Sequence, residues 1–242
     1  MYHYADAIEA LADMLGDDPV LTHDGVHRSW REFDDRAARL GQAFMAAGLR
    51  PGSKVGLLLY NCAEYYEAFL AALKMRMAPF NINYRYVGPE LAYLLDNADC
   101  EALVYHRSLA GVVREVLPDL PLVKLAVEVD DGGTGWERAR PYESLLSATA
   151  PAPRMPREPD DYHLMYTGGT TGLPKGVIYH AAPWCTGLAA MYATSVLGLP
   201  AAPLELEQLL GTVRALRAKG VVPTVLPASP LMHTAGLANS IP

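Results

Sequence analysis

The residues best suited to chemistry lie together at positions 166–176, where the sequence reads YTGGTTGLPKG. Its glycines let backbone N–H groups turn toward a ligand and approach it closely. Consecutive N–H groups that point into one concavity bind anions, and the threonine hydroxyls and Lys175 add further donors and a positive charge. A carboxylate would suit such a site, but the number of donors favours a polyphosphate.

Two familiar phosphate-binding loops differ from this one. A Walker A loop ends in Gly-Lys-Ser/Thr at the start of a helix, whereas Lys175 follows Pro174 and precedes GVIYH, a run that favours a strand. A dinucleotide-binding loop needs the spacing G-x-G-x-x-G, whereas the glycines here occupy positions 168, 169, 172 and 176. The remaining alternative is a plain turn without a ligand, which the density of donors disfavours.

Strands and helices alternate regularly ahead of this loop. Four apolar runs are predicted as strands, KVGLLLY (54–60), APFNIN (78–83), EALVYH (101–106) and VKLAVEV (123–129). Helical patterns lie between them, so residues 54–129 are predicted to form a parallel β-α-β-α-β-α-β segment. The expected fold class is therefore α/β, with a mostly parallel sheet covered by helices on both faces.

Local signals predict where several elements begin. Asp24 and Gly25 favour a two-residue hairpin turn, and Ser29 with Glu32 three residues later forms a capping box that starts a helix. Asn61 and Glu64 repeat this pattern. Asn61 is therefore predicted to cap the helix that follows the first buried strand.

Composition changes between residues 130 and 160. The stretch APAPRMPREPDD is rich in proline and charge, which favours an extended connector. We therefore place a boundary within it. Residues 1–155 are expected to form an N-terminal α/β subdomain, and residues 156–242 to begin a second α/β subdomain that carries the phosphate-binding loop.

The overall composition argues against some classes of function. A formal net charge of -7 disfavours nucleic-acid binding, which depends on clustered lysine and arginine. Three widely spaced cysteines, Cys62, Cys100 and Cys185, show no metal-ligand pattern and indicate reduced thiols in a cytoplasm. Residues 181–204 carry no charge, but prolines and glycines interrupt them, so a buried helix is favoured over a membrane span.

The stretch YTGGTTGLPKG resembles the phosphate-binding signature of the adenylate-forming superfamily of AMP-binding enzymes, which includes acyl-CoA synthetases, luciferases and non-ribosomal peptide adenylation domains. PLMHTAG at residues 230–236 resembles a Pro-Leu-x-His-x-x-Gly element found downstream in these enzymes. NINYRYVGPELAYLLDNADCEALVY at residues 81–105 resembles actinobacterial acyl-CoA synthetases that act on fatty acids or steroid side chains. The resemblance covers essentially the whole chain.

This resemblance implies a fold and an activity. The fold would be the N-terminal part of the large domain of an adenylate-forming enzyme. The activity would be acyl-CoA ligation with ATP, Mg²⁺ and CoA: a carboxylate attacks the α-phosphorus of ATP, pyrophosphate leaves, and the CoA thiol then displaces AMP. The acid would have a medium or long acyl chain or a steroid side chain. The protein would act in the cytoplasm. Peripheral contact with a membrane and assembly into homo-oligomers are both compatible with this resemblance.

The resemblance also implies roles for individual residues. Binding of the nucleotide phosphates falls to Thr167, Gly168, Gly169, Thr170, Thr171, Gly172 and Lys175. Catalytic roles fall to Lys175 and Thr170, which would stabilise the leaving pyrophosphate, and to His233, beside the acyl pocket and the α-phosphate. A structural role for His233, in the core or on the surface, stays the alternative. No metal ligands are assigned in this chain.

Members of this superfamily are longer than 242 residues, and several of their motifs have no counterpart here. We find no candidates for the adenine, ribose and Mg²⁺ contacts or for the C-terminal adenylation lysine, so the chain is expected to be the first half of an enzyme. Alone it is expected to form no acyl-CoA and, with apolar surface uncovered, to self-associate. The alternatives are a non-catalytic nucleotide-binding or interaction module and an amino-acid-activating adenylation domain.

Overall fold

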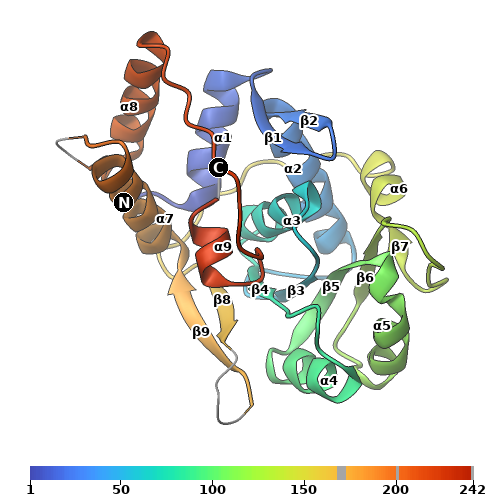
Figure 1. Ribbon diagram of the computed structural model, residues 1–242. Coiled ribbons are helices and arrows are strands. Elements are labelled where there is room, and N and C mark those ends of the chain that lie inside the picture. Colours follow the sequence, from blue (N-terminus) through green and yellow to red (C-terminus); the bar gives the residue numbers. More distant parts are fainter. Residues whose placement is uncertain (168–172, 200–201, 241–242) are drawn as a thin grey trace.

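The computed structural model describes residues 1–167, 173–199 and 202–240. Its centre is a seven-stranded sheet with the order β7-β6-β5-β3-β4-β8-β9 (Figure 1). The strands are β3 (Lys54–Leu58), β4 (Ala78–Asn81), β5 (Cys100–His106), β6 (Leu125–Val129), β7 (Arg140–Pro141), β8 (Tyr162–Thr167) and β9 (Lys175–His180). Neighbouring strands in this sheet run parallel except β8 and β9, which run antiparallel.

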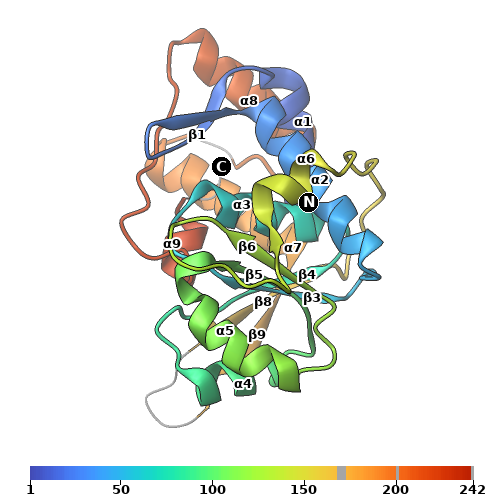
Figure 2. The same cartoon turned by 90° about the vertical axis from the view of Figure 1, so that its right-hand side faces the viewer.

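Helices cover both faces of the sheet (Figure 2). One face packs against α1 (Tyr4–Leu15), α2 (Trp30–Ala46), α3 (Ala63–Lys74), α6 (Tyr142–Ser147) and α7 (Ala181–Met191). The other face packs against α4 (Gly88–Asn97) and α5 (Ala110–Val116). The remaining strands and α-helices are the hairpin of β1 (Pro19–His23) and β2 (Val26–Ser29), and the helices α8 (Leu206–Ala218) and α9 (Thr234–Ala238).

The parallel segment predicted at residues 54–129 is confirmed. In β5, Val104 packs in the core on the α3 side and Leu103 in the core on the α4 side. Because successive side chains of a strand point to opposite faces, a strand covered on both sides is apolar at nearly every position. Strand β3, predicted to run to Tyr60, ends at Leu58. The Tyr60 N–H donates to His106 Nδ1 at 3.1 Å instead of to the backbone of a neighbouring strand.

Two of the local start signals are confirmed. Asp24 and Gly25 join β1 to β2 with φ angles of 47° and 76°, in the left-handed region that this hairpin turn requires. At the start of α2 the Glu32 N–H donates to Ser29 Oγ at 3.2 Å, and the Ser29 N–H donates to Glu32 Oε2 at 2.8 Å. The capping box therefore satisfies two N–H groups that the helix leaves without partners.

Ser29→Ala is expected to lower the free energy of unfolding by about 1 kcal/mol, because an N-cap hydroxyl is lost. Urea denaturation followed by circular dichroism measures this change. Ser144→Ala on the exposed face of α6 is the matched control, since it removes a hydroxyl that caps no helix. Equal stability losses in the two variants would show that the capping box contributes nothing.

The predicted cap at Asn61 is wrong. Helix α3 begins at Ala63 with Cys62 at the N-cap position, where no side-chain capping bond forms. The Asn61 side chain turns instead to a distant segment, donating to the Ser229 carbonyl at 3.2 Å and accepting from the Leu231 N–H at 2.8 Å. Two backbone groups of another segment thus replace the local N–H groups that the pattern predicted as partners.

An extended connector leads from α6 to β8, and one buried and one exposed ion pair attach it to the N-terminal helix. Arg157 forms a pair with Glu9 at 2.7 Å in which both side chains are 5% exposed, and Arg154 pairs with Asp13 at 2.7 Å. The sheet continues past the connector because β8 pairs with β4. The boundary between residues 1–155 and 156–242 stays a prediction.

The uncharged stretch at residues 181–204 begins as α7 and continues into a π-helical turn at Tyr192–Val196. None of the helices in the described ranges has the length and hydropathy of a bilayer-spanning segment. Cys62, Cys100 and Cys185 are all buried and free.

Candidate functional site

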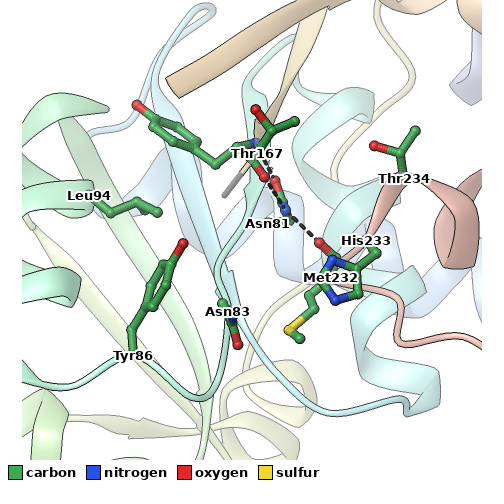
Figure 3. Close-up of a pocket in the computed structure, with 9 residues that line it drawn as sticks. Asn81, Asn83, Tyr86, Leu94, Thr167, Met232, His233 and Thr234 are labelled. Atoms are coloured by element: carbon green, nitrogen blue, oxygen red, sulfur yellow. Dashed lines mark hydrogen bonds between the residues drawn. The ribbon is translucent and has the colours of Figure 1, made fainter. Parts of the chain in front are cut away.

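A cavity of about 270 Å³ lies at the carboxyl ends of β4 and β8 (Figure 3). Ligands of open α/β sheets bind at this edge, because the loops that follow parallel strands gather there. The cavity is lined by Asn81, Asn83, Tyr86, Leu94, Tyr166, Thr167, Met232, His233 and Thr234. These residues come from the region around β4 and α4, from the end of β8, and from the turn before α9 together with the first residue of that helix.

Asn81, the last residue of β4, joins two of these regions. Its Oδ1 accepts from the Tyr166 N–H at 2.7 Å, and its Nδ2 donates to the carbonyl oxygens of Tyr166, at 3.1 Å, and of Met232. The register of β4 and β8 pairs Phe80 with Leu164, so the Asn81 side chain supplies the next links between these strands. Asn81 is 6% exposed, and water therefore competes little for these bonds.

Tyr166 forms a rigid part of the cavity wall. Its phenol donates to Asn97 Oδ1 at 2.9 Å, and its ring packs against Phe80 with centroids 5.7 Å apart. Burial raises the pKa of Tyr166 to about 12, so the hydroxyl stays protonated and uncharged at neutral pH. Gly176 lies opposite in β9, where a Cβ would be 3.1 Å from the Tyr166 ring, so glycine leaves space for that ring.

The structure brings together two of the residues that the sequence assigned to the site. Thr167 at the end of β8 and His233 before α9 both line the cavity. Lys175 is not among the lining residues, but it begins β9 and pairs in register with Thr167. Gly168, Gly169, Thr170, Thr171 and Gly172, which connect these strands in the sequence, lie outside the described residues.

His233 is carried by a tight turn at residues 230–236. The His233 N–H donates to the Pro230 carbonyl at 3.0 Å, and a Cβ at Gly236 would lie 2.1 Å from the same oxygen. No side chain fits at that distance, which accounts for the glycine in PLMHTAG. His233 is exposed and is the N-cap residue of α9. A core role for this histidine is therefore wrong, and it lies in the cavity lining.

The charge distribution of the cavity suits an anion. Its lining offers amides, hydroxyls and an imidazole but contains no Asp or Glu. Burial, followed by the charge of Glu90, raises the pKa of Tyr86, so this phenol also stays uncharged at neutral pH. Among the described residues, no group of three or more His, Cys, Asp and Glu side chains could hold a metal ion. The lining therefore offers hydrogen-bond donors with no carboxylate that would repel an anion.

Sequence reasoning assigned no role to Asn81, Asn83 or Tyr86. The signal for the first two was present, because two asparagines stand at the carboxyl end of a run predicted to be a buried strand. Polar side chains at that position of a parallel sheet face the ligand edge. Tyr86 had no such signal, since only the path of the chain into α4 brings it to the cavity that Thr167 also lines.

The chain belongs to the family of AMP-binding enzymes, whose model matches residues 8–239. It is 39% identical over 189 residues to a 3-oxocholest-4-en-26-oate–CoA ligase of Rhodococcus rhodochrous, covering 74% of this chain and 33% of that protein. It is 36% identical over 187 residues to the medium-chain acyl-CoA ligase Mig of Mycobacterium avium, covering 71% and 34%. The chain thus spans about a third of the length of these relatives.

Solved structures show the same fold. The inhibitor-bound N-terminal domain of FACL13 from Mycobacterium tuberculosis matches with a TM-score of 0.75 at 21% identity, over 100% of this chain and 54% of that one. The anthranilate–CoA ligase AuaEII matches with a TM-score of 0.72 at 23% identity, over 78% and 37%. The predicted fold, the N-terminal part of an adenylate-forming enzyme, is therefore confirmed.

Proposed function

We propose that this chain forms the phosphate-binding part of an ATP-dependent acyl-CoA ligase. One observation carries the proposal. Thr167, where the glycine-rich signature begins, and His233, from the second signature, line one cavity although they are far apart in the sequence. A structural role alone gives no reason for these two segments to meet at the ligand edge of the sheet.

In the proposed reaction a carboxylate oxygen of the acid bonds to the α-phosphorus of ATP, and the bond from that phosphorus to pyrophosphate breaks. Negative charge then grows on the leaving pyrophosphate. Thr167 and Lys175 supply donors on that side, and by resemblance so do Gly168, Gly169, Thr170, Thr171 and Gly172. His233 lies across the cavity, on the side proposed for the acyl group and the α-phosphate. The thiol of CoA then attacks the acyl carbon, and AMP leaves.

Mg²⁺, when bound with ATP, would offset part of the charge on its phosphates. The cavity lining contains no Asp or Glu, and no Mg²⁺ ligand is assigned in this chain. Fixed N–H and O–H donors are what this chain itself contributes to the charge on the leaving group.

The acid is proposed to be hydrophobic, with a medium or long acyl chain or a steroid side chain. The support comes from the relatives, whose names specify a steroid acid in one case and a medium-chain acyl group in another. Reduced, buried cysteines and the use of ATP and CoA agree with action in the cytoplasm.

The test is an assay of pyrophosphate release by the protein that contains this chain, with ATP, Mg²⁺ and a panel of acids. Release is expected with hydrophobic carboxylic acids and not without an acid, and added CoA should yield the acyl thioester. Release with amino acids alone would favour an amino-acid-activating domain. Nucleotide binding without any release would favour a non-catalytic module, and either result would overturn the proposal.

A further inference from the structure

We propose that Asn61 and Asn81, here called the asparagine pair, position the His233 segment, residues 229–233, against the end of β8. Their part in a reaction rests on the proposed function, whereas their part in the geometry does not. Asn61 follows β3 and Asn81 ends β4, so the pair lies at the carboxyl ends of neighbouring parallel strands, at the edge where the cavity lies.

The His233 segment has little backbone support of its own. Among the described residues, the backbone-to-backbone hydrogen bonds of residues 229–240 are all local, such as His233 N–H to Pro230 and Leu237 N–H to His233. Residues 221–230 contain no helix or strand. The position of His233 relative to Thr167 must therefore be set by side chains.

Asn61 binds the segment in the way that a neighbouring strand would. Its Nδ2 donates to the Ser229 carbonyl at 3.2 Å, and its Oδ1 accepts from the Leu231 N–H at 2.8 Å. One amide thus pairs with a donor and an acceptor two residues apart. Leu231 and Met232 are 1% and 2% exposed, so the backbone between them is held in a dry environment.

Asn81 holds the same segment and the start of the glycine-rich loop at once. Its Nδ2 donates to the Met232 carbonyl, next to His233, and also to the Tyr166 carbonyl, next to Thr167. Its Oδ1 accepts from the Tyr166 N–H. A single buried side chain therefore links the residue before His233 to the residue before Thr167 (Figure 3).

The two asparagines differ in what they hold, and this difference makes the inference testable. Among the described residues, the side-chain hydrogen bonds of Asn61 reach only the His233 segment, whereas those of Asn81 reach both that segment and β8. Loss of Asn61 should free the His233 segment and leave the end of β8, with Thr167, in place. Loss of Asn81 should free both the His233 segment and the end of β8.

Amide hydrogen exchange in the protein that contains this chain measures these two effects separately. In Asn61→Ala the Leu231 N–H should exchange about tenfold faster while the Tyr166 N–H is unchanged. In Asn81→Ala the Tyr166 N–H should exchange about tenfold faster as well. Asn239→Ala is the matched control, because that exposed amide bonds only to Ala235 within α9. An unchanged Leu231 rate in Asn61→Ala, or Tyr166 rate in Asn81→Ala, would overturn the inference.

Steady-state kinetics give a second test, because a merely structural role would not change kcat and the KM for ATP differently in the two variants. In the pyrophosphate assay, Asn61→Ala should lower kcat about tenfold and leave the KM for ATP within about twofold, since the phosphate side is intact. Asn81→Ala should change both constants. Equal effects of the two variants, or wild-type rates in both, would refute the role in the reaction. An inactive wild-type protein would overturn the proposed function, while the exchange rates would still decide the geometry.

Discussion

Lys175→Ala is expected to slow acid-dependent pyrophosphate release by roughly 30- to 1000-fold, which corresponds to about 2–4 kcal/mol of transition-state stabilisation. Lys175 is exposed and pairs in register with Thr167. Residues paired in this way carry their side chains on the same face of the two strands. The Lys175 side chain therefore starts from the strand position opposite Thr167, a residue that lines the cavity.

The size of this effect on the rate follows from the negative charge that grows on the leaving pyrophosphate near Lys175. Pyrophosphate gains charge as it leaves, so a cation fixed beside it stabilises the transition state more than bound ATP. The main loss should therefore appear in kcat, with a smaller change in the KM for ATP. Steady-state kinetics with saturating acid separate the two constants.

Two further variants control this experiment. Lys219→Ala removes an exposed lysine at the end of α8, far from β9 in both views of the molecule, and should keep the wild-type rate (Figures 1 and 2). Lys175→Arg keeps the charge but changes its shape, and should retain part of the activity. A wild-type rate in Lys175→Ala would show that the loop does not stabilise the leaving group.

The parallel sheet could be predicted because its signals are local. Strands β3 to β6 are continuous apolar runs, and amphipathic helices separate them, so each part of the sequence predicts its own element. The capping box at Ser29 was correct for the same reason, since both of its partners lie within one turn. Asn61 shows where this reasoning fails. Its local pattern resembles that of Ser29, but a segment distant in the sequence takes its hydrogen bonds.

The candidate site could be predicted only in part. Thr167 and His233 belong to motifs of distinctive composition, so a sequence alone selects them. That they share a cavity depends on the order of strands in the sheet, which places β4 beside β8. Asn81 joins these parts through bonds to Tyr166 and Met232, and no spacing in the sequence indicates those partners.

The chain should lose stability on mild acidification, and His163 should be a main cause. This residue of β8 is fully buried, and neither ring nitrogen has a hydrogen-bond partner within the part of the chain that the structure describes. Its ring stacks on Tyr179 at 5.5 Å and meets the edge of Trp184 at 4.5 Å between centroids. Burial, followed by the nearby His3, lowers the pKa of His163 to about 3.

The direction of the effect follows from proton binding. At pH 5 the folded protein keeps the His163 imidazole neutral, whereas the unfolded chain takes up a proton near its ordinary pKa of 6.5. The unfolded state therefore binds more protons, so this contribution to stability is present above about pH 6.5 and is lost as the pH falls toward 3. From pH 7 to pH 5 the loss due to this one residue is about 2 kcal/mol.

Replacing His163 with leucine should remove that loss. His163→Leu is similar in volume and removes two nitrogens that have no hydrogen-bond partner among the described residues. It loses the ring stacking but keeps an apolar side chain against Tyr179 and Trp184, so its free energy of unfolding at pH 7 should stay close to the wild-type value. Between pH 7 and pH 5 it should lose about 2 kcal/mol less than the wild type in urea denaturation. His27→Gln, a change at an exposed histidine of β2, should behave like the wild type. If His163→Leu loses as much stability as the wild type, the His163 imidazole must already be protonated in the folded protein, and its buried environment would then have to contain a partner for that charge.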